Sequence, residues 1–348
     1  MKKFLLIGLS LSVAIILLIL LPVTNPHRVV RANFESESLK NNKAGEEAMR
    51  ELFIYLPVDY KASNKRYPVV YYLHGYGVDH SNYFNLEIDN LLDDAINKKV
   101  TLPFILVVPN GSNKFGGSFY TNSENNGRWT DYIGKDVVNY MDANYRTIPN
   151  KNSRGICGHS MGGQGALKVA MLYPDVFGSV YAMSPSILNW GEDFHPLHRS
   201  FEKALKAQTM EELYSDAYAI AFAAMGRVFS PEPLKRPFGY QLPIKSVNGT
   251  YHTDSSIIKR WEANFVNNML DQHGSGLKNL NGLGIDWGIR DDYKHIPTSC
   301  EEFCRKLDSM QIDYLKEAYE GGHFDKIPGP AGRFATKLIP FFSRHLAF

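Results

Sequence analysis

The chain has 348 residues, of which 44% are hydrophobic and 21% are charged, a composition typical of a folded globular protein. Lysine and arginine total 38 against 36 aspartates and glutamates, so the formal net charge is +2. This balance argues against nucleic acid or an anionic surface as the partner. The three cysteines are too few for a disulfide framework, so the fold must depend on its hydrophobic core.

The N-terminal segment, residues 1–32, predicts export from the cytoplasm. Lys2 and Lys3 precede an uncharged apolar run over residues 4–21, and a polar stretch then reaches Ala32. A run of about 18 apolar residues is long for a signal peptide and lies at the lower limit for a membrane-spanning helix. We interpret the segment as either a cleaved export signal or an uncleaved membrane anchor, so the protein is expected outside the cytoplasm, secreted or anchored. A buried core helix is the less favoured alternative, because nothing polar interrupts the run.

From residue 33 onward, strand and helix patterns alternate along the chain. Short apolar runs bounded by turn residues predict buried strands, and apolar residues at helical spacing predict helices. This alternation predicts an α/β fold with a mainly parallel central sheet and helices on both faces. Strands are expected at residues 50–56, 68–73, 103–109, 154–157, 178–183, 283–287 and 313–319, and helices at 132–145, 162–173 and about 331–345.

A long segment separates the strand that ends near residue 186 from the strand that begins near residue 283. These roughly hundred residues are too many for a simple crossover between strands. We interpret residues 188–281 as a cap inserted over the carboxyl edge of the sheet, where α/β folds bind ligands. A surface insertion without function is the alternative. Because no repeat or long linker interrupts it, the region 33–348 is expected to form one catalytic domain.

Ser160 is the central residue of a GxSxG motif that spans residues 158–162. A predicted strand leads into the motif and a predicted helix leaves it, which is the context in which such a serine is a nucleophile. Gly158 and Gly162 would let neighbouring backbone pass the strained turn without a Cβ clash. The start of the helix would stabilise negative charge near the serine. The alternative is a glycine-rich turn with an incidental serine.

Acyl transfer also needs backbone donors for the oxyanion of the tetrahedral intermediate. The N–H of Met161, directly after the serine, is one candidate. The second donor is expected in the loop after an early strand, and residues 73–77 (LHGYG) end the predicted strand 68–73. The backbone N–H of Tyr76 is the candidate there, although a plain glycine turn would have a similar sequence.

The catalytic base and its acid are expected downstream of Ser160, because the order in such hydrolases is serine, acid, histidine. His159 is excluded, since it belongs to the turn itself and is expected to point away from the serine. His323 is preferred because it lies in a glycine-containing loop between the last strand and the last helix. Asp291 is preferred over Asp292 as the acid, because adjacent residues at a strand end point in opposite directions. A buried carboxylate would fix the imidazole tautomer and stabilise the imidazolium.

Taken together, these motifs resemble the putative esterase family of α/β-hydrolases, which includes esterase D and S-formylglutathione hydrolases, feruloyl esterases, enterochelin esterases and mycolyltransferases. The resemblance covers nearly all of residues 33–348 and implies an α/β-hydrolase fold. In the family the acid follows a glycine by three positions, which falls on Asp291, and the histidine follows paired glycines, which matches His323. The resemblance rests on RELFIYLPVDY, YPVVYYLHGYG, FYTNS, WTDYIGKDVVNYMDANYRTIP, GHSMGG, YPDVFGSVYAMSPS, IDWGIRDD and YEGGHF.

The main hypothesis is an extracytoplasmic serine esterase that hydrolyses carboxylic esters through Ser160, His323, Asp291 and an acyl-enzyme. One alternative is an acyltransferase that moves the acyl group to a sugar or another alcohol. A second is a noncatalytic binding protein on a hydrolase scaffold. No metal or cofactor is implied, and the expected partner is a small-molecule or carbohydrate-linked ester.

The substrate pocket is predicted less directly. Tyr120, Asn122 and Trp129 follow the predicted strand 103–109 and are expected to line the pocket, with packing of their own loop as the alternative. The segment 188–281 should build the rest of the pocket. It contains no motif that defines the acyl group or the alcohol, and the oligomeric state does not follow from the sequence.

Overall fold

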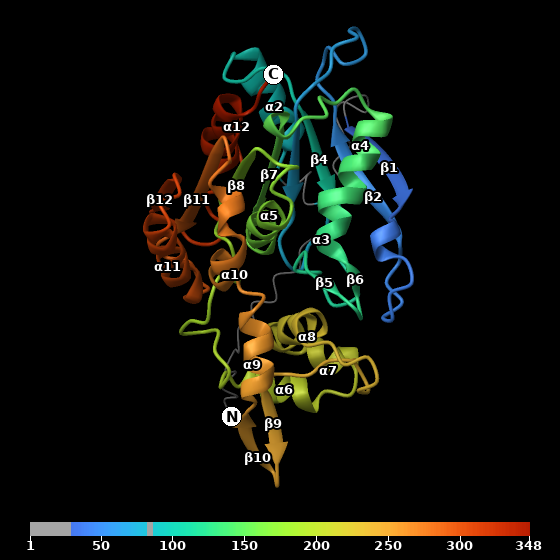
Figure 1. Cartoon of the computed structure of the whole chain (residues 1–348), viewed down its shortest axis with the longest axis vertical. Helices are drawn as coiled ribbons and strands as arrows, with labels where there is room; N and C mark the ends of the chain where they lie inside the picture. Colours follow the sequence, from blue (N-terminus) through green and yellow to red (C-terminus); the bar gives the residue numbers. More distant parts are fainter. Residues whose placement is uncertain (1–28, 82–85) are drawn as a thin grey trace, which may run out of the picture.

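The computed structural model describes residues 29–81 and 86–348, and within them the main body is built on an eight-stranded sheet (Figure 1). The strand order is β1-β2-β4-β3-β7-β8-β11-β12. The six strands from β4 to β12 are parallel, whereas β1 pairs with β2, and β2 with β4, in the antiparallel direction. The strands are β1 (Val29–Glu35), β2 (Met49–Tyr55), β3 (Val69–Leu73), β4 (Ile105–Pro109), β7 (Arg154–His159), β8 (Ser179–Met183), β11 (Gly282–Gly288) and β12 (Leu315–Tyr319).

Helices cover both faces of the sheet, so the predicted mainly parallel α/β architecture is confirmed. Alternate residues of β3 show the two faces: Val69 and Tyr71 belong to one apolar cluster, and Val70 and Tyr72 to the other. Every residue of β3 is buried, because a central parallel strand packs against helices on both sides. The first cluster contains α4 (Val138–Asn144), α5 (Met161–Leu172) and α11 (His295–Ser309), and the second contains α2 (Ile88–Asn97) and α12 (Ile339–His345).

Several shorter elements complete the main body. α3 (Trp129–Asp131), η2 (Tyr132–Val137) and α4 follow one another without a break and correspond to the helix predicted at 132–145. η5 (Phe334–Leu338) leads directly into α12 in the same way. The others are η1 (Glu37–Leu39), η3 (Lys151–Ser153), η4 (Gly274–Leu277) and the small antiparallel pair β5 (Asn122–Ser123) and β6 (Gly127–Arg128).

The edge strand β1 begins earlier than the boundary predicted at residue 33. Residues 29–35 pair with β2 over their whole length, and Ala32, opposite Leu52, is buried. This strand was not predicted because its residues alternate between polar and apolar and form no continuous apolar run. Such alternation is expected of an edge strand with one solvated face. Cleavage after Ala32 would therefore remove the first half of β1.

The rest of the predicted export signal or anchor, residues 1–28, lies outside the described residues. Within residues 29–81 and 86–348, no helix combines the length and the apolar character needed to cross a membrane.

The segment between β8 and β11 contains residues 188–281, which the sequence analysis interpreted as a cap. Figure 1 shows most of it as a separate lobe at one end of the sheet, which we call the cap. The last helix of the segment, α10, leaves the cap and packs against α5 of the main body. The cap contains α6 (Ser200–Lys206), α7 (Met210–Tyr214), α8 (Ala217–Phe229), the hairpin β9 (Ile244–Val247) and β10 (Thr250–Thr253), and α9 (Ser255–Glu262); α10 spans Val266–His273.

The three cysteines are buried and form no disulfide. Cys157 lies on β7, and Cys300 and Cys304 lie one helical turn apart on α11. Burial raises the pKa of all three thiols, that of Cys304 to about 11. They act as core residues, in agreement with the expectation that the fold does not depend on a disulfide framework.

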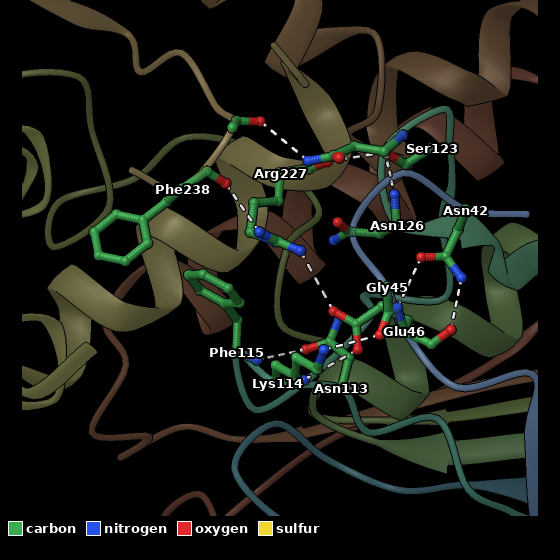
Figure 2. A network of polar contacts seen from close by, with 12 residues as sticks. Asn42, Gly45, Glu46, Asn113, Lys114, Phe115, Ser123, Asn126, Arg227 and Phe238 are labelled. Carbon is green, nitrogen blue, oxygen red and sulfur yellow. Dashed lines mark hydrogen bonds and ion pairs between the residues drawn. The ribbon is translucent and has the colours of Figure 1, made fainter. Parts of the chain in front are cut away.

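A buried ion pair ties α8 of the cap to the main body (Figure 2). Arg227 Nη2 lies 3.4 Å from Glu46 Oε1, and the two side chains are only 8% and 3% exposed. Arg227 also donates to the Phe238 carbonyl at 2.9 Å and lies over the Phe115 ring. Ser123 adds a hydrogen bond to the Arg227 carbonyl. Burial lowers the pKa of Arg227, and the nearby Glu46 carboxylate opposes that effect.

Replacing Glu46 with Ala should destabilise the fold by about 3–5 kcal/mol, because it leaves a buried guanidinium without its carboxylate. Urea unfolding followed by circular dichroism measures the change. The control is Asp94→Ala, which breaks the exposed Asp94–Lys98 pair on α2 and should cost no more than about 0.5 kcal/mol. Equal effects of the two substitutions would contradict a structural role for the buried pair.

Candidate active site

Ser160 occupies a strained turn between β7 and α5. Its φ of 57° and ψ of −119° lie in a region that is unfavourable for a residue with a side chain. A Cβ atom on Gly162 would overlap the Leu73 carbonyl, and one on Gly158 would overlap the backbone of Gly162. Both positions therefore require glycine, because a Cβ atom would clash with neighbouring backbone, as the sequence analysis predicted.

Hydrogen bonds from neighbouring segments hold this turn in place. The Ser160 N–H donates to the Met183 carbonyl of β8 at 2.9 Å. The Ser160 carbonyl accepts from the N–H groups of Gln164 and Ser186, each at 3.1 Å. The strained conformation is thus fixed by the adjacent strand, by α5 and by the segment after β8.

Asp291 and His323 form a buried pair in the loops that follow β11 and β12. The distance from Asp291 Oδ2 to His323 Nδ1 is 2.7 Å, and the side chains are 0% and 1% exposed. The second carboxylate oxygen of Asp291 accepts the Tyr293 N–H at 2.9 Å. Asp292, the alternative acid, is exposed. With Nδ1 directed at a carboxylate, His323 Nε2 is left to accept a proton, and it has no hydrogen-bond partner among the described residues.

Ser160 and His323 line the same cavity, which has a volume of about 430 Å³. The structure thus brings together the predicted nucleophile, base and acid from three separate loops at the carboxyl ends of β7, β11 and β12. In unliganded sites of this kind, the hydrogen bond between nucleophile and base often tightens only when substrate binds.

His159 does not point away from the site, as the sequence analysis expected. It lines the cavity with Ser160, its Nε2 lies 2.9 Å from the His323 carbonyl, and the two imidazole rings are 4.6 Å apart. Burial, together with the neighbouring His323 ring, lowers the pKa of His159 to about 3. The ring is therefore neutral at ordinary pH and supports the backbone of His323 by donating to its carbonyl.

The two predicted oxyanion donors lie beside the serine. Met161 N–H is at the first position of α5, and the loop that carries Tyr76 passes the serine so closely that a Cβ on Gly75 would contact the Ser160 Cβ. Among the described residues, neither the Tyr76 nor the Met161 amide donates to a protein acceptor. Both donors are therefore available to a ligand.

The sequence analysis missed His74, which holds this loop. Its Nδ1 donates to the Gly75 carbonyl at 2.9 Å, and its Nε2 accepts from the Gly111 N–H at 2.9 Å. Burial lowers the pKa of His74 to about 4, so the ring is neutral and can serve as donor and acceptor at once. The only sequence signal for it is its place within LHGYG, residues 73–77.

Apolar and aromatic side chains form most of the cavity wall. The main body provides Phe119, Ile187, Ile296 and Phe324 among others, and α8 of the cap provides several more. The residues from the inserted segment are Phe194, Ala217, Tyr218, Ala221, Phe222 and Met225.

The three residues predicted to line the pocket do not reach this cavity. Tyr120 is fully buried and donates its hydroxyl to the His74 carbonyl at 3.0 Å. Trp129 is also fully buried, with its indole N–H on the Asn126 carbonyl at 2.9 Å. Asn122 lines a different cavity. The packing alternative is therefore correct for Tyr120 and Trp129, because their loop folds into the core.

The mainly parallel sheet with helices on both faces is the fold of the α/β-hydrolases. The chain belongs to the putative esterase family, whose model matches residues 46–219, half of the sequence. The resemblance stated from the motifs is therefore confirmed.

Curated relatives match part of the chain. Esterase Rv1288 of Mycobacterium tuberculosis is 31% identical over 135 residues, which are 38% of this chain and 28% of that protein. An endo-1,4-beta-xylanase/feruloyl esterase of Xylanibacter ruminicola is 30% identical over 142 residues, 37% of this chain and 19% of that protein. The match thus spans less than a third of the length of these relatives.

Solved structures extend the likeness over nearly the whole chain. A ferulic acid esterase superposes with a TM-score of 0.61 at 18% identity, covering 92% of this chain and 98% of that one. An S-formylglutathione hydrolase of Staphylococcus aureus gives a TM-score of 0.54 at 18% identity, covering 85% and 91%. At these identities the likeness establishes the fold.

A second cavity, of about 350 Å³, lies between α5, α9, α10 and the β5–β6 segment. Lys168 of α5 lines it, is 1% exposed and donates to Thr121 Oγ1 at 2.7 Å. Burial lowers the pKa of Lys168 to about 7. The folded chain therefore carries a lysine that loses its proton far more readily than it does in the unfolded chain.

The contribution of Lys168 to stability should depend on pH. Between about pH 7 and the ordinary lysine value of 10.5, the unfolded chain binds more protons at this residue, so stability should rise with pH relative to a chain without it. Urea unfolding of wild type and Lys168→Met at pH 7, 8.5 and 10 measures this difference. Lys278→Met, at an exposed position, is the control. If the free energy of unfolding differs between wild type and Lys168→Met by the same amount at all three pH values, the lowered pKa is contradicted.

Proposed function

We propose that the chain is a serine carboxylic ester hydrolase that forms an acyl-enzyme on Ser160, with His323 as general base and acid and Asp291 as the orienting carboxylate. The observation that carries the proposal is the buried 2.7 Å contact between Asp291 Oδ2 and His323 Nδ1, in the wall of the cavity that contains Ser160. Membership of the putative esterase family supports ester hydrolysis as the reaction.

In the acylation step, Ser160 Oγ attacks the carbonyl carbon of the ester and its proton passes to His323 Nε2. Asp291 accepts the Nδ1–H and so stabilises the imidazolium that forms. The backbone N–H groups of Tyr76 and Met161 donate to the oxyanion of the tetrahedral intermediate. When this intermediate collapses, His323 returns the proton to the departing alcohol.

In the deacylation step, water attacks the acyl-enzyme by the same route in reverse. His323 removes a proton from the water and the second tetrahedral intermediate forms. When this intermediate collapses, the bond from Ser160 Oγ to the acyl carbon breaks, His323 returns the proton to Oγ and the carboxylic acid leaves. An acyltransferase would differ only in this step, because a sugar or another alcohol would replace water. We propose hydrolysis as the main reaction, and product analysis with and without a sugar acceptor separates the two.

The cavity supports an ester with an apolar acyl group of moderate size. Its wall is largely apolar and aromatic, and its volume of about 430 Å³ lies within the range of small-molecule sites. One solved structure of this fold is a ferulic acid esterase in complex with ferulic acid, so aromatic acyl esters, free or carbohydrate-linked, are the first substrates to test. A location outside the cytoplasm is also part of the proposal and is supported by the apolar run at residues 4–21.

Ser160→Ala should lower kcat for nitrophenyl esters by at least about 10³-fold and abolish labelling by a fluorophosphonate probe, because the nucleophile is lost. Ser186→Ala is the matched control, since Ser186 lines the same cavity. It should keep both hydrolysis and labelling. Full activity of Ser160→Ala, or labelling that depends on Ser186, would overturn the assignment.

Asp291→Asn should lower kcat by about 10⁴-fold, because an amide at that position no longer holds the Nδ1–H tautomer of His323. Asp292→Asn changes the adjacent, exposed carboxylate and should stay within about twofold of wild type. Steady-state kinetics on the same nitrophenyl ester measure both. The reverse order of effects would assign the acid to Asp292 instead.

A further inference from the structure

A second pair of histidine and aspartate lies in the cavity that contains Ser160. His295, the first residue of α11, lines the cavity and is 4% exposed. Its Nδ1 lies 2.8 Å from Oδ1 of Asp193, a residue of the inserted segment between β8 and α6. The catalytic role proposed for Asp291 and His323 makes no use of this pair.

Asp193 is held by several donors in addition to the imidazole. The N–H groups of Lys294 and His295 donate to it at 2.8 and 2.7 Å, and the Tyr218 hydroxyl donates at 3.2 Å. Burial alone would raise the pKa of Asp193, but the hydrogen bonds from His295 and from these amides outweigh burial and hold the pKa well below its usual range. Asp193 is therefore an anionic acceptor that keeps a proton on His295 Nδ1.

The other ring nitrogen of His295 has no protein partner. Nε2 is buried, and among the described residues nothing forms a hydrogen bond with it. Its surroundings are aromatic: the Phe194 ring lies 5.3 Å from the imidazole, and the Tyr293 ring lies 6.3 Å from it. Native structures leave few buried polar atoms unpaired, and this one belongs to a residue that lines the cavity, where a ligand can supply the partner.

We propose that His295 Nε2 is a polar subsite of the cavity that accepts a hydrogen bond from a hydroxyl group on an aryl ester, with Asp193 as its positioning residue. The proposal rests on the proposed function, because the subsite discriminates among substrates of Ser160. With Nδ1 directed at Asp193, the ring nitrogen that faces a ligand is Nε2, whose lone pair matches a hydroxyl donor. A carboxylate on the substrate is disfavoured, since two histidines of the cavity wall, His295 and His323, already contact the carboxylates of Asp193 and Asp291.

The physical basis of selectivity is the penalty for leaving Nε2 unpaired. A site that hydrogen-bonds a substrate hydroxyl discriminates strongly against an analogue that lacks the hydroxyl. An apolar pocket discriminates only weakly against an analogue that carries an added hydroxyl. The aromatic wall accepts either aryl ring, so the hydrogen bond to Nε2 alone should separate the two substrates.

The experiment compares kcat/KM for pairs of methyl aryl esters that differ only by one phenolic hydroxyl, in wild type and in His295→Leu. For each protein, the hydroxyl preference is kcat/KM for the hydroxylated ester divided by kcat/KM for the plain ester. Dividing the wild-type preference by that of the variant cancels the intrinsic reactivity of the esters and any general loss of activity. We expect the hydroxyl preference to fall at least tenfold in His295→Leu. His295→Gln, which keeps an acceptor oxygen, should restore part of the preference, and Asp193→Asn should lower it.

His252→Leu, on the exposed strand β10, is the matched control and should keep the wild-type ratio. Thermal unfolding of each variant separates loss of the fold from loss of selectivity, and fluorophosphonate labelling reports Ser160. An unchanged ratio in a folded, labelled His295→Leu protein would overturn the subsite while leaving the proposed function intact. If wild type is neither labelled nor active on any ester, the proposed function falls, and the subsite falls with it.

Discussion

The backbone strain at Ser160 constrains the arrangement of the whole sheet. The turn exists only because the Leu73 end of β3 passes directly beside Gly162, and because the Met183 carbonyl of β8 accepts the Ser160 N–H. β3 and β8 are the two neighbours of β7, and both run parallel to it. A shift in register of β8 would remove the carbonyl that accepts the Ser160 N–H, and a shift of β3 would change the backbone that Gly162 must pass. The parallel centre of the sheet and the serine turn are therefore coupled.

The proposed reaction and the proposed selectivity depend on different parts of the chain. Ser160, Asp291 and His323, the proposed reacting groups, lie in loops at the carboxyl ends of parallel strands. The inserted segment supplies part of the apolar wall of the cavity and also Asp193, which contacts His295 of the main body. Under the proposed function, sequence changes in the insertion alter the substrate while the reacting groups stay in place.

Residues with a local signal could be predicted from the sequence, and residues defined by distant contacts could not. The central strands are short apolar runs between turn residues, and the order of Ser160, Asp291 and His323 follows from motifs beside predicted strand ends. The pair of Asp193 and His295 is 102 residues apart in sequence, so no spacing rule indicates it. The orientation of the Tyr120 loop was also missed, because Tyr120 has a positive φ that turns its ring into the core. β1 escaped detection because its polar residues face solvent.

The buried cysteines have a consequence for covalent chemistry. The thiolate is the reactive form of cysteine, and burial raises the pKa of Cys157, Cys300 and Cys304 while keeping reagents away from them. Thiol-directed electrophiles and reducing agents should therefore leave the native protein unmodified. An adduct that an electrophilic probe forms on the folded chain is therefore expected on a group other than a cysteine sulfur.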